Sequence, residues 1–372
     1  MKGKHFSVGN ILGIPIYLDY SWFIILVLLT WMLAQSYFPL EFKNWPVFSY
    51  WLVGLITSFF FFLSILIHEL GHSIIAKRYK LKVKRITLFV FGGVAEISNE
   101  APKSSAEFWI AIAGPITSFI LAGIFYLLAE LFAQNQYLFA PFWYLALMNF
   151  ILAIFNLIPG FPLDGGRIFR AIVWGVTKDH KRATSIAANA GRFFGYLFIM
   201  IGVFQMIQNN VFNGLWIAFI GWFLENAAKS QVQSQALNDL LFGHQVREAL
   251  SNDFCIVYPD STVQEIIDNK FIGAHRRDLL VKDDNKMVGF LTPHQIKSLS
   301  ISDRENKTVK EVMMPLQKII KIKADESLLD ALRAQNENDE GEIPIMENGN
   351  CIGILNQTSI LRFIFELHKL RH

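Results

Sequence analysis

The segment from Trp45 to Ile67 runs for 23 residues without a charged side chain. A bilayer core about 30 Å thick needs roughly 20 apolar residues in one helix, so this segment can span a membrane. Further apolar segments occur along the first part of the chain. We predict spans near Tyr20–Tyr37, Pro46–Ala76, Phe108–Phe132, Pro141–Leu157, Phe193–Ile207 and Val211–Leu224. The last two are short and could form one hairpin of tilted or partly buried helices, so the number of spans after residue 190 stays open.

The composition divides the chain into two parts. Charged residues make up 17% of the 372 residues, whereas soluble domains average about 25%. Residues 1–230 hold 17 Lys and Arg against 10 Asp and Glu, a net charge of +7, and residues 231–372 hold 17 against 21, a net charge of −4. The first part is therefore typical of a membrane protein and the second of a soluble domain. Two cysteines exclude a disulfide-rich scaffold in a chain of this length.

Lys and Arg gather in alternate connections between the predicted spans. Cytoplasmic loops keep an excess of these residues. With six spans, the N-terminus, both basic loops and the C-terminal part all face the cytoplasm. We interpret the basic residues as topology signals rather than as a nucleic-acid-binding surface. The two basic groups are Lys77, Arg78, Lys80, Lys82, Lys84, Arg85 and Lys103, and Arg167, Arg170, Lys178, Lys181, Arg182 and Arg192.

The uncharged segment ends at the sequence His68-Glu69-Leu70-Gly71-His72. On a helix, two histidines four residues apart project from one face and can bind the same metal ion. Glu69 then lies beside the metal, where it can take a proton from an attacking water molecule. A charged residue at this depth is costly and marks a functional site by default. The alternative is a pair of hydrogen-bonded helix histidines with a glutamate that reaches the interface.

A catalytic zinc site needs a third protein ligand and one open position. We select Asp164, which follows an interrupted segment that contains Pro159, Gly160 and Pro162. Broken backbone within a membrane is tolerated only where it is buried in protein or lines a wet cavity. A carboxylate there could reach the histidine pair. The alternative is an aspartate at the N-cap of the helix beginning at Gly166, or in the turn before it.

These motifs resemble those of the site-2 protease family of intramembrane zinc metalloproteases. The resemblance rests on His68–His72, on Ala113-Gly114-Pro115 in the next span and on the Asn-x-x-Pro-x-x-Pro-Leu-Asp-Gly-Gly sequence at Asn156–Gly166. It covers most of residues 1–230. It implies a multi-pass protein of a prokaryotic plasma membrane that hydrolyses peptide bonds of transmembrane or membrane-associated proteins near the cytoplasmic face, as part of regulated proteolysis.

The resemblance also implies roles for single residues. His68, His72 and Asp164 become ligands of one Zn²⁺ per chain, and Glu69 becomes the general base.

Gly92 and Gly93 lie in a predicted β-hairpin, at Thr87–Ile97. The family resemblance implies that this hairpin dips toward the active site, where a strand edge could hold an extended substrate. It also implies that Asn156 contacts the substrate near the metal. The alternatives are a plain cytoplasmic hairpin and an asparagine that bonds between helices.

The C-terminal part contains a repeat with the order helix, strand, helix, strand, strand, helix. It resembles a tandem pair of CBS domains, a module that often senses adenosine nucleotides. Family members that bind a ribose usually carry an acidic residue where this chain has Gln295 and Ser359. Two interpretations therefore stay open, an adenine-nucleotide sensor and a ligand-free module for dimerisation or substrate docking.

The sequence thus predicts a polytopic α-helical membrane protein with about six transmembrane helices and a short β-hairpin, followed by an α/β tandem CBS module. We place the metalloprotease domain at residues 1–230, a linker at 231–243 and the CBS repeats at 244–303 and 304–372. Expected partners are a protein substrate, the lipid bilayer and a second copy bound through the CBS domains, but no nucleic acid. A CBS-gated transporter or channel, with His68, Glu69 and Asp164 lining an ion path, is the alternative, and a catalytically silent scaffold is a third.

Overall fold

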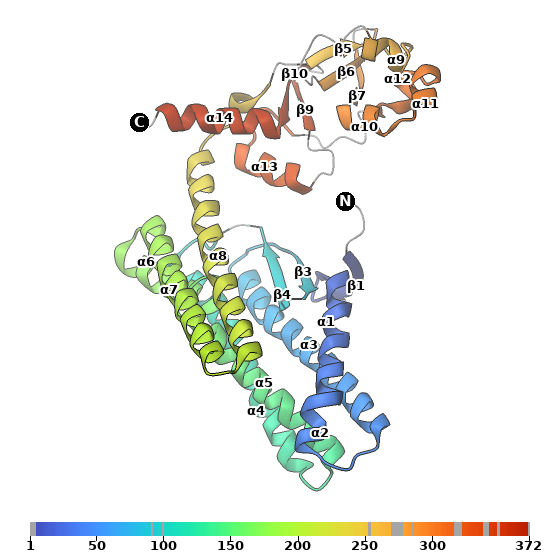
Figure 1. Cartoon of the computed structure of the whole chain (residues 1–372). Coiled ribbons are helices and arrows are strands. Elements are labelled where there is room, and N and C mark those ends of the chain that lie inside the picture. Colours follow the sequence, from blue (N-terminus) through green and yellow to red (C-terminus); the bar gives the residue numbers. More distant parts are fainter. Residues whose placement is uncertain are drawn as a thin grey trace. The chain divides into compact units, whose positions relative to one another are not determined.

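The computed structural model describes residues 5–90, 92–98, 100–251, 254–268, 278–284, 286–315, 322–337, 342–347 and 350–370. The chain forms two compact units, Met1–Gln235 and Ala236–His372. Figure 1 shows the helices and strands of both units.

Long apolar helices build the first unit. The first helical segment, Tyr20–Glu41, consists of α1 (Tyr20–Met32), a π-helical turn (Leu33–Tyr37) and α2 (Phe38–Glu41), and the next helices are α3 (Val47–Arg78), α4 (Ser104–Leu131), α5 (Gln136–Asn156), α6 (Asp164–Thr177) and α7 (His180–Ile207). Among the described residues, five helical segments are long and apolar enough to cross a membrane: Tyr20–Glu41, α3, α4, α5 and α7. The chain is therefore a multi-pass α-helical membrane protein, as predicted.

The helices after residue 190 are longer than predicted. In place of two short segments, the structure has α7 with 28 residues and α8 (Val211–Leu241) with 31 residues. The two helices pack through glycines, since a Cβ atom on Gly202 would lie 2.5 Å from the carbonyl oxygen of Gly214. The sixth predicted span is thus the first half of α8, and residues 231–241 of the predicted linker are its helical second half.

A four-stranded sheet adjoins the helices, with the order β1 (His5–Ile11), β2 (Ile14–Asp19), β3 (Val83–Phe89) and β4 (Gly92–Ile97). The predicted hairpin is β3 and β4, whereas β1 and β2 were not predicted from the sequence. β2 pairs in parallel with β3, and the other two pairs are antiparallel. Alternate residues of β2 and β3, including Ile16 and Ile86, pack into one core with Phe62 and Leu66 of α3. The sheet thereby supports the part of α3 that carries the His-Glu-x-x-His motif.

The order of the elements brings several segments to the sheet end of the helices. α3 ends just before β3, α4 begins just after β4, and α5 ends before the loop that leads into α6. The C-terminal part of α3, the N-terminal part of α4 and the start of α6 therefore lie near one end of this unit (Figure 1).

The second unit has the predicted α/β order. Its first part contains a 3-10 turn (Val246–Ala249), β5 (Phe254–Val257), α9 (Val263–Ile266), β6 (Asp278–Asp283), β7 (Lys286–Leu291), α10 (Pro293–Ser298) and α11 (Ile301–Asn306). Its second part contains α12 (Val309–Val312), β8 (Met314–Pro315), α13 (Leu328–Glu337), β9 (Glu342–Glu347), β10 (Asn350–Asn356) and α14 (Gln357–Leu370). The strands form two sheets, β5-β6-β7-β8 and β10-β9. The domain boundaries stay predictions.

Candidate metal centre

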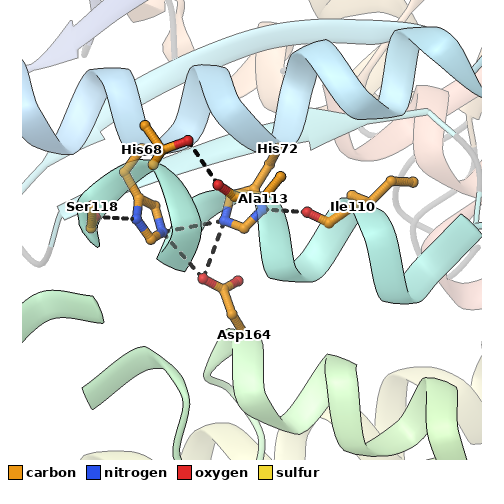
Figure 2. Close-up of polar contacts among 7 residues, drawn as sticks. His68, His72, Ile110, Ala113, Ser118 and Asp164 are labelled. Atoms are coloured by element: carbon orange, nitrogen blue, oxygen red, sulfur yellow. Dashed lines mark hydrogen bonds and ion pairs between the residues drawn. The ribbon is translucent and has the colours of Figure 1, made fainter. Parts of the chain in front are cut away.

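Three side chains from two helices converge on one point. His68 and His72 project from the same face of α3, and each is only 4% exposed. Asp164 is the first residue of α6. Its Oδ2 atom lies 3.1 Å from His68 Nε2 and 3.2 Å from His72 Nε2, and the two Nε2 atoms are 3.2 Å apart (Figure 2). Residues almost one hundred positions apart thus form a small triangle of nitrogen and oxygen atoms.

The triangle has the size and the chemistry of a zinc site. Two ligand atoms about 2.0 Å from a tetrahedral zinc ion are about 3.3 Å apart, which is close to the three distances observed. Two imidazoles and one carboxylate are common zinc ligands and leave the fourth tetrahedral position open. Within the described residues, His68, His72 and Asp164 can each offer one metal-ligand atom, and these three atoms all lie within 4.8 Å of one another. The residues present therefore fit a catalytic zinc ion.

Helix α4 holds the outer nitrogen of each imidazole. His72 Nδ1 bonds to the carbonyl oxygen of Ile110 at 2.7 Å, and His68 Nδ1 bonds to Ser118 Oγ at 2.8 Å (Figure 2). A carbonyl oxygen only accepts, so the proton of a neutral His72 lies on Nδ1 and the lone pair of Nε2 points into the triangle. Such outer contacts orient metal-binding histidines.

Gly114 of α4 leaves the space that an ion would need. A Cβ atom at this position would collide with His72 Nε2 and would lie 2.6 Å from His68 Nε2. Any side chain here would press against the two imidazole nitrogens that would bind the ion. The sequence Ala113-Gly114-Pro115 therefore has a local physical reason for its glycine.

We expect Gly114→Ala to prevent zinc binding, because the added methyl group would displace the two imidazole nitrogens. Zinc content of the purified protein measures the effect, and a loss of at least about 100-fold in affinity is expected, more than a displaced outer contact costs. Gly123→Ala is the matched control on the same helix, since a Cβ atom there meets nothing within 4 Å. Full zinc content in Gly114→Ala would contradict the position assigned to the ion.

Glu69 lies half-buried beside the triangle, one residue after His68. β4 covers it from one side, because a Cβ atom on Gly93 would lie 2.6 Å from Glu69 Cγ. Gly92 has a φ of +126°, and a Cβ atom there would meet nothing within 4 Å. The structure therefore brings Gly93 to the glutamate, whereas Gly92 serves the turn between β3 and β4.

The loop between α5 and α6 presents Asp164 to the histidines. The N-cap position of α6 is Leu163, so the interpretation of Asp164 as the helix cap is wrong. Gly166 packs so closely on the backbone of Gly160 and Phe161 that a Cβ atom would collide with it. Asn156, the last residue of α5, is half-buried, and no hydrogen bond among the described residues joins its side chain to the triangle.

Several residues around the site were not predicted from the sequence. Ser118 follows Gly114 by one helical turn. A polar residue on an apolar helix is the sequence feature that could have indicated its place at the site. The carbonyl group of Ile110 carries no sequence signal at all. Arg170 was counted among the basic loop residues, but it is buried in α6 against Glu107 of α4.

In the second unit, Gln295 and Ser359 take part in helix capping. Gln295 Oε1 accepts from the backbone N–H of Thr292 at 2.9 Å, and the backbone N–H of Gln295 donates to Thr292 Oγ1 at 3.2 Å. Asn356 and Ser359 form the corresponding pair, with bonds of 3.1 and 2.8 Å. Both side chains therefore already have backbone partners.

Comparison with known proteins gives matches for both units. Residues 56–138 and 130–202 match Peptidase family M50, and residues 309–366 match the CBS domain. The chain is 32% identical over 368 residues to a protein of Synechocystis named as a zinc metalloprotease, covering 96% of this chain and 95% of that protein. It is 31% identical over 362 residues to a protein of Mycobacterium tuberculosis named as the zinc metalloprotease Rip3, covering 96% of this chain and 92% of that protein.

Two solved structures are similar to parts of the chain. The site-2 protease from Methanocaldococcus jannaschii is 32% identical, with a TM-score of 0.44, and the match covers 61% of this chain and 95% of that one. A CBS domain-containing protein from Thermotoga maritima is 22% identical, with a TM-score of 0.28, and the match covers 34% and 96%.

Proposed function

The chain belongs to peptidase family M50, the site-2 proteases, and from this premise we propose that it cuts transmembrane or membrane-associated proteins near the cytoplasmic face of the membrane. In this proposal His68, His72 and Asp164 hold one zinc ion per chain, and Glu69 is the general base. The observation that carries the proposal is the triangle of two Nε2 atoms and one Oδ2 atom, with edges of 3.1 to 3.2 Å. Its two histidines lie on the same turn of α3 as Glu69.

A bound metal ion and the side chains of the protein would supply different parts of the chemistry. A bound zinc ion would polarise the scissile carbonyl group and lower the pKa of its water toward about 7. The Glu69 carboxylate takes the proton of the attacking water and passes it to the nitrogen of the leaving amine. Ser118 and the Ile110 carbonyl keep the two imidazoles in place meanwhile.

We propose that β4 holds the substrate. A transmembrane helix hides its peptide bonds, so it must unwind locally before hydrolysis. β4 is the last strand in the sheet order, and its outer edge can pair with an extended peptide. Because Gly93 lies against Glu69, a peptide paired along β4 would pass beside the general base. Gly92 supports the turn between β3 and β4, and Asn156 is proposed as a further substrate contact.

The distribution of basic residues supports one orientation. With the first half of α8 as a sixth crossing, the N-terminus and the CBS domains both face the cytoplasm, on the side that collects Lys and Arg. The close packing of α8 on α7 supports its return through the membrane. The proposed location is a prokaryotic plasma membrane.

The CBS domains are proposed to regulate cleavage. Because Gln295 and Ser359 are engaged as helix caps, we favour a ligand-free module that binds a second copy or docks the substrate over an adenine-nucleotide sensor. A CBS-gated transporter is not favoured, because membership of a peptidase family gives the triangle and Glu69 a role that an ion path does not require.

Cleavage in proteoliposomes tests the proposal. The substrate is a single transmembrane helix with a Gly-Pro pair near its cytoplasmic end, and the matched control is the same helix with Leu in both places. We expect cleavage of the first substrate near the Gly-Pro pair, loss of cleavage with a zinc chelator and recovery with added zinc. Cleavage that continues in zinc-free protein, or equal cleavage of both helices, would contradict the proposed mechanism.

A further inference from the structure

Arg170 of α6 and Glu107 of α4 form a buried ion pair. Arg170 Nε donates to Glu107 Oε1 at 2.6 Å, and Arg170 Nη2 contacts the same oxygen. Glu107 is 1% exposed and Arg170 is 8% exposed. Arg170 also bonds to Thr184 of α7 at 3.5 Å and lies over the ring of Phe161 at 5.1 Å. The pair therefore joins three helices to the loop that precedes Asp164.

Stability alone does not account for this pair. Burying two charges costs free energy that their attraction often fails to recover. In addition, Glu107 Oε2 is buried with no hydrogen-bond partner among the described residues, and an unsatisfied buried acceptor is costly. What the contact does fix is the distance between α4 and α6.

That distance determines the geometry of the metal centre. α4 holds both imidazoles through Ile110 and Ser118, and Glu107 lies one turn before Ile110 on the same face of the helix. α6 carries Asp164, and Arg170 follows it by six residues, about 9 Å along the same helix. The ion pair thus joins the helix that orients the histidines to the helix that carries the carboxylate.

We propose that Glu107 and Arg170 are positioning residues that set the distance from the Asp164 carboxylate to the two imidazoles and thereby the affinity for zinc. The inference rests on the proposed function, because it takes the three side chains as zinc ligands. Zinc tolerates deviations of about 0.2 Å in its ligand distances, so a small shift of α6 along α4 weakens binding. Arg170 therefore acts through Asp164 and does not itself touch the substrate.

The test measures zinc binding by the full-length protein in detergent. In Arg170→Met we expect the zinc dissociation constant, measured by competition with a chelator, to rise about 10–100-fold. The visible absorption of Co²⁺ bound in place of zinc should also change, because it depends on coordination geometry. Arg170→Lys, which keeps the charge, should recover part of the affinity. Arg192→Met is the control, since it removes another interhelical ion pair, 3.3 Å from Glu225, and should keep wild-type affinity.

A purely structural role gives a different result. If the folded Arg170→Met protein keeps wild-type zinc affinity and an unchanged Co²⁺ spectrum, the inference is wrong. Glu107→Gln provides the same comparison if Arg170→Met does not fold. Wild-type protein that binds no zinc would overturn the proposed function and this inference together, whereas zinc-binding wild type with unaffected variants would overturn this inference alone.

Discussion

Glu69→Gln should keep about one zinc ion per chain and lower the rate of peptide cleavage by about 10²–10⁴-fold, the usual contribution of a general acid–base group. The amide has nearly the shape of the carboxylate, but it cannot take a proton from water. Glu69 supplies none of the three atoms of the triangle, so its charge is not needed to complete the zinc ligand set. Cleavage in proteoliposomes and zinc content of the same preparation measure the two effects.

Measuring zinc content and cleavage separately identifies the role of Glu69. Loss of zinc together with activity would show that Glu69 belongs to the ligand set. Undiminished cleavage would show that another group moves the proton. Glu130→Gln is the matched control, because Glu130 is an exposed glutamate in the last turn of α4, sixteen residues beyond Gly114, and it should change neither quantity.

The sequence predicted the parts of the site that depend on local spacing. His68 and His72 could be placed on one face of a helix because the helical repeat brings residues four apart together. The apolar segments likewise predicted a multi-pass protein, because a bilayer demands long uncharged helices. Asp164 was predicted from the interrupted segment that precedes it, and the structure brings its carboxylate to the histidines.

The remaining features depend on contacts between distant segments. β1 and β2 precede the first apolar helix, and their place in the sheet follows from the pairing of β2 with β3, about seventy residues later in the chain. In the sequence, Arg170 resembles other basic residues such as the exposed Lys181 and Arg182, and its burial against Glu107 is seen only in the structure. The length of α8 was underestimated because its polar second half gives no apolar signal. Such features require the tertiary structure.

Removal of a proposed ligand should have a still larger effect on the metal centre than the loss of an outer contact. We expect His68→Ala and Asp164→Ala each to lower zinc affinity by more than the roughly 10–100-fold that outer contacts contribute, and to abolish cleavage. His68 and Asp164 each supply one atom of the triangle, and two remaining donors do not make a catalytic zinc site. Elemental analysis of detergent-purified wild type and both variants measures the metal.

Two control variants distinguish loss of a ligand from general damage to the fold. Asp179 is also an aspartate at the start of a helix, but its carboxylate caps α7 by accepting from the N–H of Arg182 at 2.9 Å. Asp179→Ala should therefore lower stability by about 1 kcal/mol through the lost cap and leave zinc content unchanged. His180→Ala, in the first turn of α7, is the control for His68→Ala. If Asp164→Ala behaves like Asp179→Ala and retains its zinc, Asp164 is not a ligand, and the third ligand must be sought elsewhere. Because the structure directs Asp164 Oδ2 to both imidazoles, we expect the two aspartate variants to differ.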